Sequence, residues 1–285
     1  MPPTIIALIG ADGQLGTDLA ERIPRESLRP LYYPAFDVTR RDAAAEALRA
    51  LRPDVVINTA AFNRVEECED KIEEAFQVNA FAVRGLSRVC AELGATLVHF
   101  STDYVFDGRK GAPYVEDDVP RPLCAYGESK LAGEHFIQAL WARHFVIRTC
   151  GLFGRAGCLD KGRNFVQTML DLAGQGRPIR VVTDQRVTPT STEELADNVL
   201  ALIPTKAYGL YHMTNEGECS WYEFAAAIFD LTGRRADLEP VASGAFGQKA
   251  RRPAYSVLEN ARAKALALPG FSPWREALAR HLARS

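Results

Sequence analysis

Residues 4–9 form a short apolar segment that ends at a turn with glycines at intervals of three, Gly10, Gly13 and Gly16. A run this short, rich in isoleucine and bounded by a glycine, predicts a strand buried on both faces of a sheet. The glycines let the backbone turn tightly, and a helix from about Gln14 would direct its first N–H groups at a pyrophosphate. The same spacing could serve only a tight turn with close helix packing. We favour a dinucleotide site because the turn joins the first strand to the first helix.

The same order of strand and helix continues through the first half of the chain. Apolar strand-like segments alternate with segments of helical period, and each helix is long enough to connect two parallel strands. The expected elements are strands at 54–58, 95–101 and 145–149, and helices at about 39–51, 71–93 and 126–142. Strands that alternate with helices are typical of a parallel sheet covered on both faces. The predicted fold class is α/β, with a doubly wound, Rossmann-like parallel sheet over residues 1–150.

The pattern changes after residue 150. The expected elements are a loop at 151–162, a helix at about 164–174, strands at 179–182 and 210–213, and helix starts at Ser191, Ser220 and near Ser272. Ser191 and Ser220 each precede a glutamate by three residues, which is the spacing of a capping box. We predict that residues 151–285 form a smaller α/β substrate lobe, with some exchange of chain back to the first domain. A ligand should lie between the two lobes, at the carboxyl ends of the parallel strands.

Composition excludes several other classes of protein. The chain has 285 residues, 47% of them hydrophobic, and a net charge of −2 without a basic stretch, which argues against a nucleic-acid surface. No apolar stretch has membrane-spanning length and no charged leader precedes the first strand, so we expect a cytoplasmic protein without a membrane partner. The histidines show no metal-ligand spacing, so we expect no metal site. Scattered cysteines without a CxxC pair predict buried thiols at Cys68, Cys90, Cys124, Cys150, Cys158 and Cys219.

Tyr126 and Lys130 are four residues apart and would lie on one face of a helix. A phenol titrates at about 10 in water, so an ammonium group one turn away could stabilise its anion and make it a useful acid or base. Such a pair is common on solvated helices and alone is weak support for catalysis. The glycine turn, and Ser101-Thr102-Asp103 at the end of a predicted strand, favour a catalytic role for it.

Several segments together resemble one known family. They are the glycine turn 10–16, Ser101–Gly108, Tyr126–Lys130, Asn164-Phe165 and Arg252-Pro253. In this order they resemble the dTDP-4-dehydrorhamnose reductases, which are extended short-chain dehydrogenase/reductases, over nearly the whole chain. The resemblance implies that NADPH or NADH reduces the C4 ketone of a nucleotide-linked 4-keto-6-deoxyhexose, most simply dTDP-4-dehydrorhamnose to dTDP-rhamnose. It also implies a small sugar nucleotide as the binding partner and allows for a homodimer.

The resemblance assigns the chemistry to Thr102, Tyr126 and Lys130. A ketone that gains hydride on carbon needs its oxygen polarised and then protonated. By similarity, Tyr126 donates the proton, Lys130 binds the nicotinamide ribose, and Thr102 donates a hydrogen bond to the carbonyl oxygen. Thr102 could instead bond its own backbone at the end of the strand. Asp103 could orient a sugar hydroxyl or cap the following turn, and the sequence leaves both interpretations open.

The same resemblance supplies a set of cofactor-binding residues. They are Gly10, Asp12, Gly13, Gln14, Leu15, Gly16, Asp37, Val38, Ala60, Ala61, Asn79, Ser101, Tyr126 and Lys130. Asp37 would meet the adenine end, but it could also be the N-cap of the helix expected from about residue 39. Ala60 and Ala61 would allow the adenosine to approach closely, or could simply pack. Residues 31–35 contain neither a carboxylate for a ribose 2′-hydroxyl nor an arginine for a 2′-phosphate, so the preference between NADH and NADPH stays open.

Substrate-binding residues also follow from the resemblance. They are Val65 and Glu66 beside the sugar, Asn164 and Phe165 at the nucleotide end, Arg252 near the diphosphate, and Thr102, Asp103 and Tyr126 at the ketone. The planar fork of an arginine suits a diphosphate because it offers paired donors at fixed charge. Gly151 stands where the family usually has an aromatic residue, so we expect a missing stacking surface and a wider pocket. Val187 replaces a usual glycine, and its neighbour Arg186 could bind phosphate or form a surface salt bridge.

Two other functions use the same fold. One is a binding subunit similar to the regulatory subunit of methionine adenosyltransferase, which keeps the cofactor cradle without this catalytic role. The other is a sugar-nucleotide epimerase or dehydratase, which combines a Tyr/Lys pair with a tightly held NAD. Stoichiometric consumption of added reduced cofactor is expected of the reductase alone.

Overall fold

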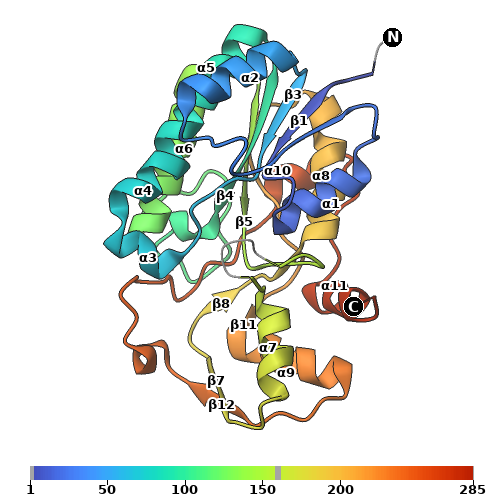
Figure 1. Ribbon diagram of the computed structural model, residues 1–285. Helices are drawn as coiled ribbons and strands as arrows, with labels where there is room; N and C mark the ends of the chain where they lie inside the picture. The colour runs from blue at the N-terminus through green and yellow to red at the C-terminus, as the bar shows by residue number, and fades with distance from the viewer. Residues whose placement is uncertain (1–2, 158–161, 285) are drawn as a thin grey trace.

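The computed structural model describes residues 3–157 and 162–284. The larger lobe is built on a six-stranded sheet in the order β10-β5-β4-β3-β1-β2 (Figure 1). Its strands are β1 (Ile6–Ile9), β2 (Leu28–Leu31), β3 (Val55–Asn58), β4 (Thr96–Thr102), β5 (His144–Thr149) and β10 (Gly209–His212). Every neighbouring pair is parallel. The predicted α/β class with a Rossmann-like sheet is confirmed.

Helices cover both faces of this sheet (Figure 1). One face carries α1 (Gln14–Arg22), α8 (Thr192–Leu202) and the short α10 (Ala261–Lys264), and the other carries α2 (Arg41–Leu51), α5 (Ala82–Leu93) and α6 (Ala125–Leu140). Successive strand residues point to opposite faces, so Leu8 and Ile57 join the apolar cluster under α1 and α8 while Ala7 and Val56 join the cluster under α2 and α5. The strand β1 is apolar throughout, as the sequence predicts, whereas the buried strands β4 and β5 also carry polar residues such as His99 and Arg148.

The helix expected at 71–93 is broken near its start. The chain forms α3 (Val65–Asp70), α4 (Ile72–Phe76) and a π-helical turn η1 (Gln77–Phe81) before α5 begins. The π turn carries Asn79, whose side chain bonds both the N–H and the carbonyl of Phe62 and also the hydroxyl of Ser129. These bonds hold the loop after β3 against α6, and π turns of this kind are frequent at functional sites.

The smaller lobe lies below the sheet in Figure 1. Its helices are α7 (Phe165–Ala173), α9 (Trp221–Thr232) and α11 (Trp274–Leu282). Its short strands are β6 (Leu152–Phe153) beside β9 (Thr190–Ser191), β7 (Ile179–Val182) beside β12 (Leu238–Val241), and β8 (Arg186–Val187) beside β11 (Cys219–Ser220). Phe153 and Phe224 are fully buried at the centre of its core. The remaining short 3₁₀ turns are η2 (Asp103–Val105), η3 (Ile203–Thr205) and η4 (Ser243–Phe246).

Part of the second half of the chain returns to the larger lobe. Helix α8 packs on α1, and β10 pairs with β5 at the edge of the main sheet. The α9 helix begins with a complete capping box between Ser220 and Glu223, as predicted. At Ser191 the predicted helix starts, but the capping box does not form, because Glu194 instead accepts hydrogen bonds from Ser272 and Asn215.

Five cysteines in the described part of the chain are buried and form no disulfide bond, as the sequence predicts: Cys68, Cys90, Cys124, Cys150 and Cys219. Cys158 lies outside the described residues. Within residues 3–157 and 162–284, no helix combines the length and the apolar character that a bilayer span requires, and no group of three His, Cys, Asp or Glu side chains is placed to hold a metal ion.

Candidate active site

The glycine turn lies directly after β1, at the carboxyl edge of the sheet. Gly10 has a φ of 74°, and a Cβ there would lie 2.6 Å from the hydroxyl oxygen of Thr59, so the position needs a glycine. A Cβ on Gly16 would overlap the carbonyl oxygen of Gly10, which explains how α1 packs so closely on the turn. Gly13 is the N-cap of α1 and provides no side-chain cap. The first N–H groups of α1 therefore point to space that an anion can occupy.

Two polar side chains at this turn fit a bound dinucleotide. Among the described residues, Asp12 Oδ1 and Gln14 Nε2 are buried and have no hydrogen-bond partner. Buried polar atoms without partners cost free energy, so a ligand that supplies a donor to Asp12 and an acceptor to Gln14 would remove that cost. Leu15, by contrast, is 5% exposed and belongs to the apolar core under α1. The glycine turn and these orphaned atoms together fit NADPH or NADH.

The loop after β3 lies beside the turn. A Cβ on Gly10 would come 3.3 Å from the backbone nitrogen of Ala60, so the small residues Ala60 and Ala61 follow the glycine turn closely. Asn79, predicted to bind the cofactor, uses its amide to fasten this loop. The Asn79 side chain therefore holds the loop after β3 in position through Phe62.

Asp37 lies in the turn before α2. Its carboxylate accepts hydrogen bonds from the N–H and the hydroxyl of Thr39 at 2.9 and 2.7 Å. The alternative role as N-cap is wrong, because α2 begins at Arg41 and its N-cap is Arg40. The neighbouring Val38 is buried in the core under α2.

Two glycines bring α6 close to the turns η2 and η1. A Cβ on Gly127 would overlap the carbonyl oxygen of Tyr104 in η2, and a Cβ on Gly133 would overlap the carbonyl oxygen of Asn79. Neither overlap can be relieved by rotating a side chain, since both involve backbone atoms. The glycines therefore set how near Tyr126 comes to the end of β4.

The structure brings Thr102 and Tyr126 together. The Thr102 hydroxyl is close enough to Tyr126 to act on the pKa of its phenol, and it accepts a hydrogen bond from the N–H of Tyr104 at 3.2 Å. Burial raises the pKa of Tyr126, and the Thr102 hydroxyl opposes this only in part. The lowered pKa that the sequence suggested is wrong, because desolvation of the phenolate outweighs the other effects. A phenol that keeps its proton at neutral pH is suited to the role of proton donor.

Asp103 lies behind Thr102 and is buried. It accepts hydrogen bonds from the Thr102 hydroxyl at 3.0 Å and from the Cys150 thiol at 3.1 Å. Burial raises the pKa of Asp103. The side chain that caps the following turn is Thr102, so the capping role considered for Asp103 is wrong. A protonated Asp103 could donate to Thr102, which would free the Thr102 proton for an acceptor in the site.

Lys130 lies one turn beyond Tyr126 and is 2% exposed. Its ammonium nitrogen is 3.3 Å from His99 Nε2 on β4. Burial lowers the pKa of Lys130 to about 8, and the charge of Glu134 opposes that shift. The sequence prediction did not include His99, which lies in the middle of an apolar strand and carries no local signal of function.

A buried ion pair supports this part of α6. Glu134 binds Arg148 of β5 through two hydrogen bonds of 2.9 and 2.6 Å, and both side chains are at most 3% exposed. Ser101, predicted to bind the cofactor, donates its hydroxyl to Glu134. That hydroxyl is therefore committed to the framework behind the catalytic residues.

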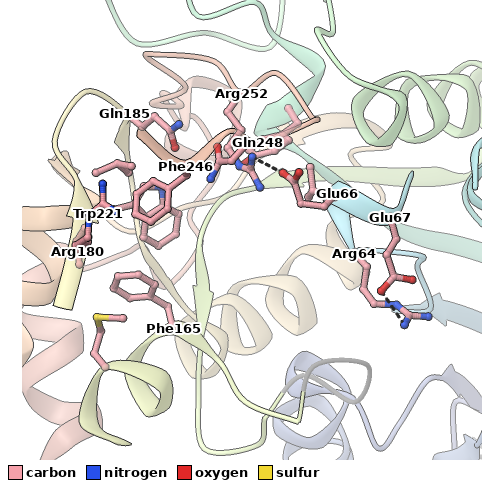
Figure 2. A pocket seen from close by; sticks show the side chains of 15 residues that line it. Arg64, Glu66, Glu67, Phe165, Arg180, Gln185, Trp221, Phe246, Gln248 and Arg252 are labelled. Carbon is pink, nitrogen blue, oxygen red and sulfur yellow. Dashed lines mark hydrogen bonds and ion pairs between the residues drawn. The ribbon is translucent and has the colours of Figure 1, made fainter. Parts of the chain in front are cut away.

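A cavity of about 700 Å³ opens between the two lobes. Val65 and Glu66 of α3 line one side, and Glu66 forms an ion pair with Arg252 at 2.6 Å (Figure 2). The Tyr104 ring lines the cavity and lies edge-on to the Tyr126 ring, with centroids 5.8 Å apart. Predicted substrate residues thus line a cavity whose wall, at Tyr104, contacts the ring of Tyr126.

An aromatic group forms the opposite wall. Figure 2 shows Phe165, Trp221 and Phe246 gathered on the side away from Glu66. The Phe165 and Trp221 rings are 4.8 Å apart, and Arg180 lies 5.3 Å from the centre of the Phe246 ring. Trp221, Phe246 and Arg180 were not predicted. Trp221 is the first residue of a capped helix, where the sequence signals only a helix start.

Trp221 also changes the expectation for Gly151. A Cβ on Gly151 would lie 3.4 Å from the outer edge of the indole, which is ordinary contact distance. The aromatic surface expected to be missing at Gly151 is therefore supplied by α9. Gly151 itself has a φ of 53°, a conformation that favours glycine.

Two other predicted residues have partners within the protein. Asn164 is 5% exposed and caps α7, with its amide nitrogen also donating to the carbonyl of Gly154 at 2.7 Å. Arg186 pairs with Glu218 at 2.7 Å and Glu223 at 3.4 Å, so the salt-bridge interpretation is confirmed.

Known proteins resemble this chain in sequence and in structure. A family model described as RmlD substrate binding domain matches residues 4–285. The chain belongs to this family. One relative, the spore coat polysaccharide biosynthesis protein SpsK of Bacillus subtilis, is 37% identical over 98% of this chain and 97% of its own length.

Other relatives carry the name of the enzyme. The dTDP-4-dehydrorhamnose reductase of Escherichia coli is 36% identical over 93% of this chain and 94% of its own length. The solved dTDP-4-dehydrorhamnose reductase of Bacillus anthracis, in complex with NADP, superposes with a TM-score of 0.95 at 34% identity, covering 99% of this chain and 100% of that one. The family resemblance predicted from the sequence is confirmed.

Proposed function

We propose that this chain reduces the C4 ketone of dTDP-4-dehydrorhamnose to dTDP-rhamnose, with NADPH or NADH as the reductant. The observation that carries the proposal is the position of Tyr126, which lies beside Thr102 and one helical turn from the buried Lys130, and whose ring contacts Tyr104 in the cavity wall. A site with a proton donor, a hydroxyl to polarise a carbonyl and a cation for the ribose is what hydride transfer to a ketone requires.

Tyr126, Thr102 and Lys130 each have a separate role in the reduction. When bound, the reduced nicotinamide supplies the hydride. Tyr126 keeps its proton at neutral pH and delivers it to the developing alkoxide, and Thr102 directs a hydrogen bond at the same oxygen. Lys130 binds the ribose hydroxyls and stabilises the tyrosinate that remains. The alkoxide is stabilised by donors that are already in position, so the reaction needs little reorganisation.

The two walls of the cavity suit the two ends of a nucleoside diphosphate sugar. The aromatic rings of Phe165, Trp221 and Phe246 offer flat surfaces for a base. Arg252, 16% exposed and already oriented by Glu66, can turn its free donors to a diphosphate, with Arg180 as a second cation at the base end. Val65 and Glu66 are then left to contact the sugar.

The test is a substrate panel. Purified protein is mixed with dTDP-4-dehydrorhamnose, or with UDP- and GDP-linked 4-keto-6-deoxyhexoses, and with NADPH or NADH, and the loss of reduced-nicotinamide absorbance is followed. We expect one equivalent of cofactor to be oxidised per dTDP-4-dehydrorhamnose. An epimerase would convert the sugar without net oxidation, and a regulatory subunit would do neither. Either result would refute the proposal.

A further inference from the structure

A line of buried polar groups runs from β3 through β4 to Lys130. Asn58 Nδ2 lies 3.1 Å from His99 Nδ1, and His99 Nε2 lies 3.3 Å from Lys130 Nζ. Asn58, His99 and Lys130 are each at most 2% exposed. Water cannot readily replace these contacts, so each group must find a donor or acceptor among its neighbours.

The backbone decides which way the hydrogen bonds run. Asn58 Oδ1 accepts from the N–H of Ala60 at 3.2 Å, which leaves the amide nitrogen of Asn58 facing His99. An amide nitrogen only donates, so His99 Nδ1 must be the acceptor. In a neutral imidazole the proton then sits on Nε2, and Nε2–H points at Lys130. Burial and the nearby lysine lower the pKa of His99 well below its usual value, so the ring stays neutral.

A neutral amine accepts this hydrogen bond, whereas an ammonium opposes it donor to donor. We propose that His99, oriented by Asn58, is a positioning residue that holds Lys130 in place and weakens its hold on a proton, so that Lys130 exchanges a proton at the pH of the reaction. This inference rests on the proposed function only for its consequence in turnover. The charge state of Lys130 can be measured without it.

Glu134 and Tyr126 are the titratable groups of α6 one turn to either side of Lys130. Glu134 lies one turn further along α6 and favours the ammonium, but it is shared with Arg148 of β5. Tyr126 lies one turn back on α6 and is neutral because burial raises its pKa. From the β4 side, the group that faces the amine is His99. Burial lowers the pKa of Lys130 to about 8 against the charge of Glu134, and the donor of His99 adds to that lowering in our proposal.

The consequence concerns the second half of the reaction. Once Tyr126 has given its proton to the sugar, it must regain one before the next turnover. An amine that titrates near the working pH releases a proton to the tyrosinate more readily than an ordinary lysine, because transfer is most efficient when the pKa lies near the pH. His99 would thus make Lys130 a proton reserve in addition to a ribose ligand.

The test is a titration of Lys130 in the intact free protein. The protein is labelled with ¹³C-lysine, the Lys130 signal is assigned by its absence in Lys130→Met, and its chemical shift is followed from pH 6 to 11. We expect a midpoint near pH 8 in the wild type. His99→Gln loses the N–H donor and can offer a carbonyl to the ammonium. In Asn58→Asp the carboxylate accepts a hydrogen bond, so the imidazole of His99 carries its proton on Nδ1 and Nε2 becomes an acceptor. Both should raise the midpoint by one unit or more.

His212→Gln is the matched control, because His212 is also fully buried on a strand of the same sheet. Its midpoint for Lys130 should equal that of the wild type. A wild-type midpoint near 10.5, or unchanged midpoints in both His99→Gln and Asn58→Asp when each still unfolds cooperatively, would overturn the inference. In turnover, kcat/KM for NADPH at pH 9 is divided by its pH-independent value at lower pH. If the pKa of Lys130 rises by one unit, this ratio should be roughly fivefold higher in the variants than in the wild type. A wild type without turnover would refute the proposed function, and the titration of Lys130 would still decide the inference about His99.

Discussion

Gly127→Ala tests how closely α6 must approach the end of β4. The new Cβ would overlap the carbonyl oxygen of Tyr104 and come within 2.9 Å of Pro122 Cβ. Because a backbone atom is involved, the helix and η2 must separate by roughly 1 Å, at a cost of about 1–3 kcal/mol for overpacking. The better helix propensity of alanine returns about 1 kcal/mol, so the fold should survive. The separation moves Tyr126 away from Thr102, and a displacement of this size can lower the rate by about 100-fold.

Gly85→Ala is the matched control for this variant. Gly85 also lies inside a helix, α5, but a Cβ there would meet only the side chain of Arg41 at 3.5 Å. It should keep the wild-type kcat and gain up to about 1 kcal/mol of stability. The measurements are NADPH oxidation with saturating substrates and thermal unfolding. If Gly127→Ala reduces the ketone as fast as Gly85→Ala, close approach of α6 is not what places the proton donor.

Four further predictions concern single residues. Tyr126→Phe should retain NADPH affinity in a fluorescence titration and lose about 10²–10⁴-fold in kcat, and near-normal turnover would exclude the tyrosine as proton donor. Gly13→Val should weaken cofactor binding with little loss of stability, since its side chain would fill the pyrophosphate cradle; unchanged affinity would count against that cradle. Glu134→Ala leaves the charge of Arg148 buried and unpaired, so chemical denaturation should show a loss of about 3–5 kcal/mol, and a loss below about 1 kcal/mol would contradict the buried ion pair. Burial lowers the pKa of His212 to about 3, so the unfolded chain takes up a proton below its ordinary pKa while the folded chain does not. Stability should then fall by about 2 kcal/mol between pH 6.5 and 5 on account of this residue, and His212→Gln should show a shallower fall.

Local sequence was enough to predict most of the larger lobe. The apolar strand before Gly10 and the turn that follows are determined by near neighbours, and so is the capping box at Ser220. The break at Asn79 was missed, because one residue inserted into a helix hardly alters its apolar period. At Ser191 the predicted capping bond was lost to Ser272, a partner 78 residues beyond Glu194.

The same contrast between local and long-range contacts separates the site residues that were predicted from those that were missed. Tyr126 and Lys130 were predicted from their spacing and Thr102 from the family resemblance. In the structure Tyr126 and Lys130 lie one turn apart on α6, and Thr102 at the end of β4 lies beside Tyr126. The wall formed by Trp221 was missed, because its contact with Gly151 depends on how two lobes fold onto each other. His99 was missed for a related reason. It lies within a strand, and its contact with Lys130 forms only when α6 packs against β4. Asn79 and Ser101 were predicted as ligands of the cofactor, whereas their polar atoms bond the framework.

The return of β10 to the main sheet has a consequence for how this protein can be divided. A fragment that stops at residue 150 would leave β5 as a bare edge strand and remove α8 from the apolar face that includes Leu8 and Ile57. Exposed edges of this kind invite aggregation. Neither lobe is therefore a module that could be cut out or exchanged by a single splice. Grafting a new substrate specificity onto this scaffold would have to proceed side chain by side chain within the cleft.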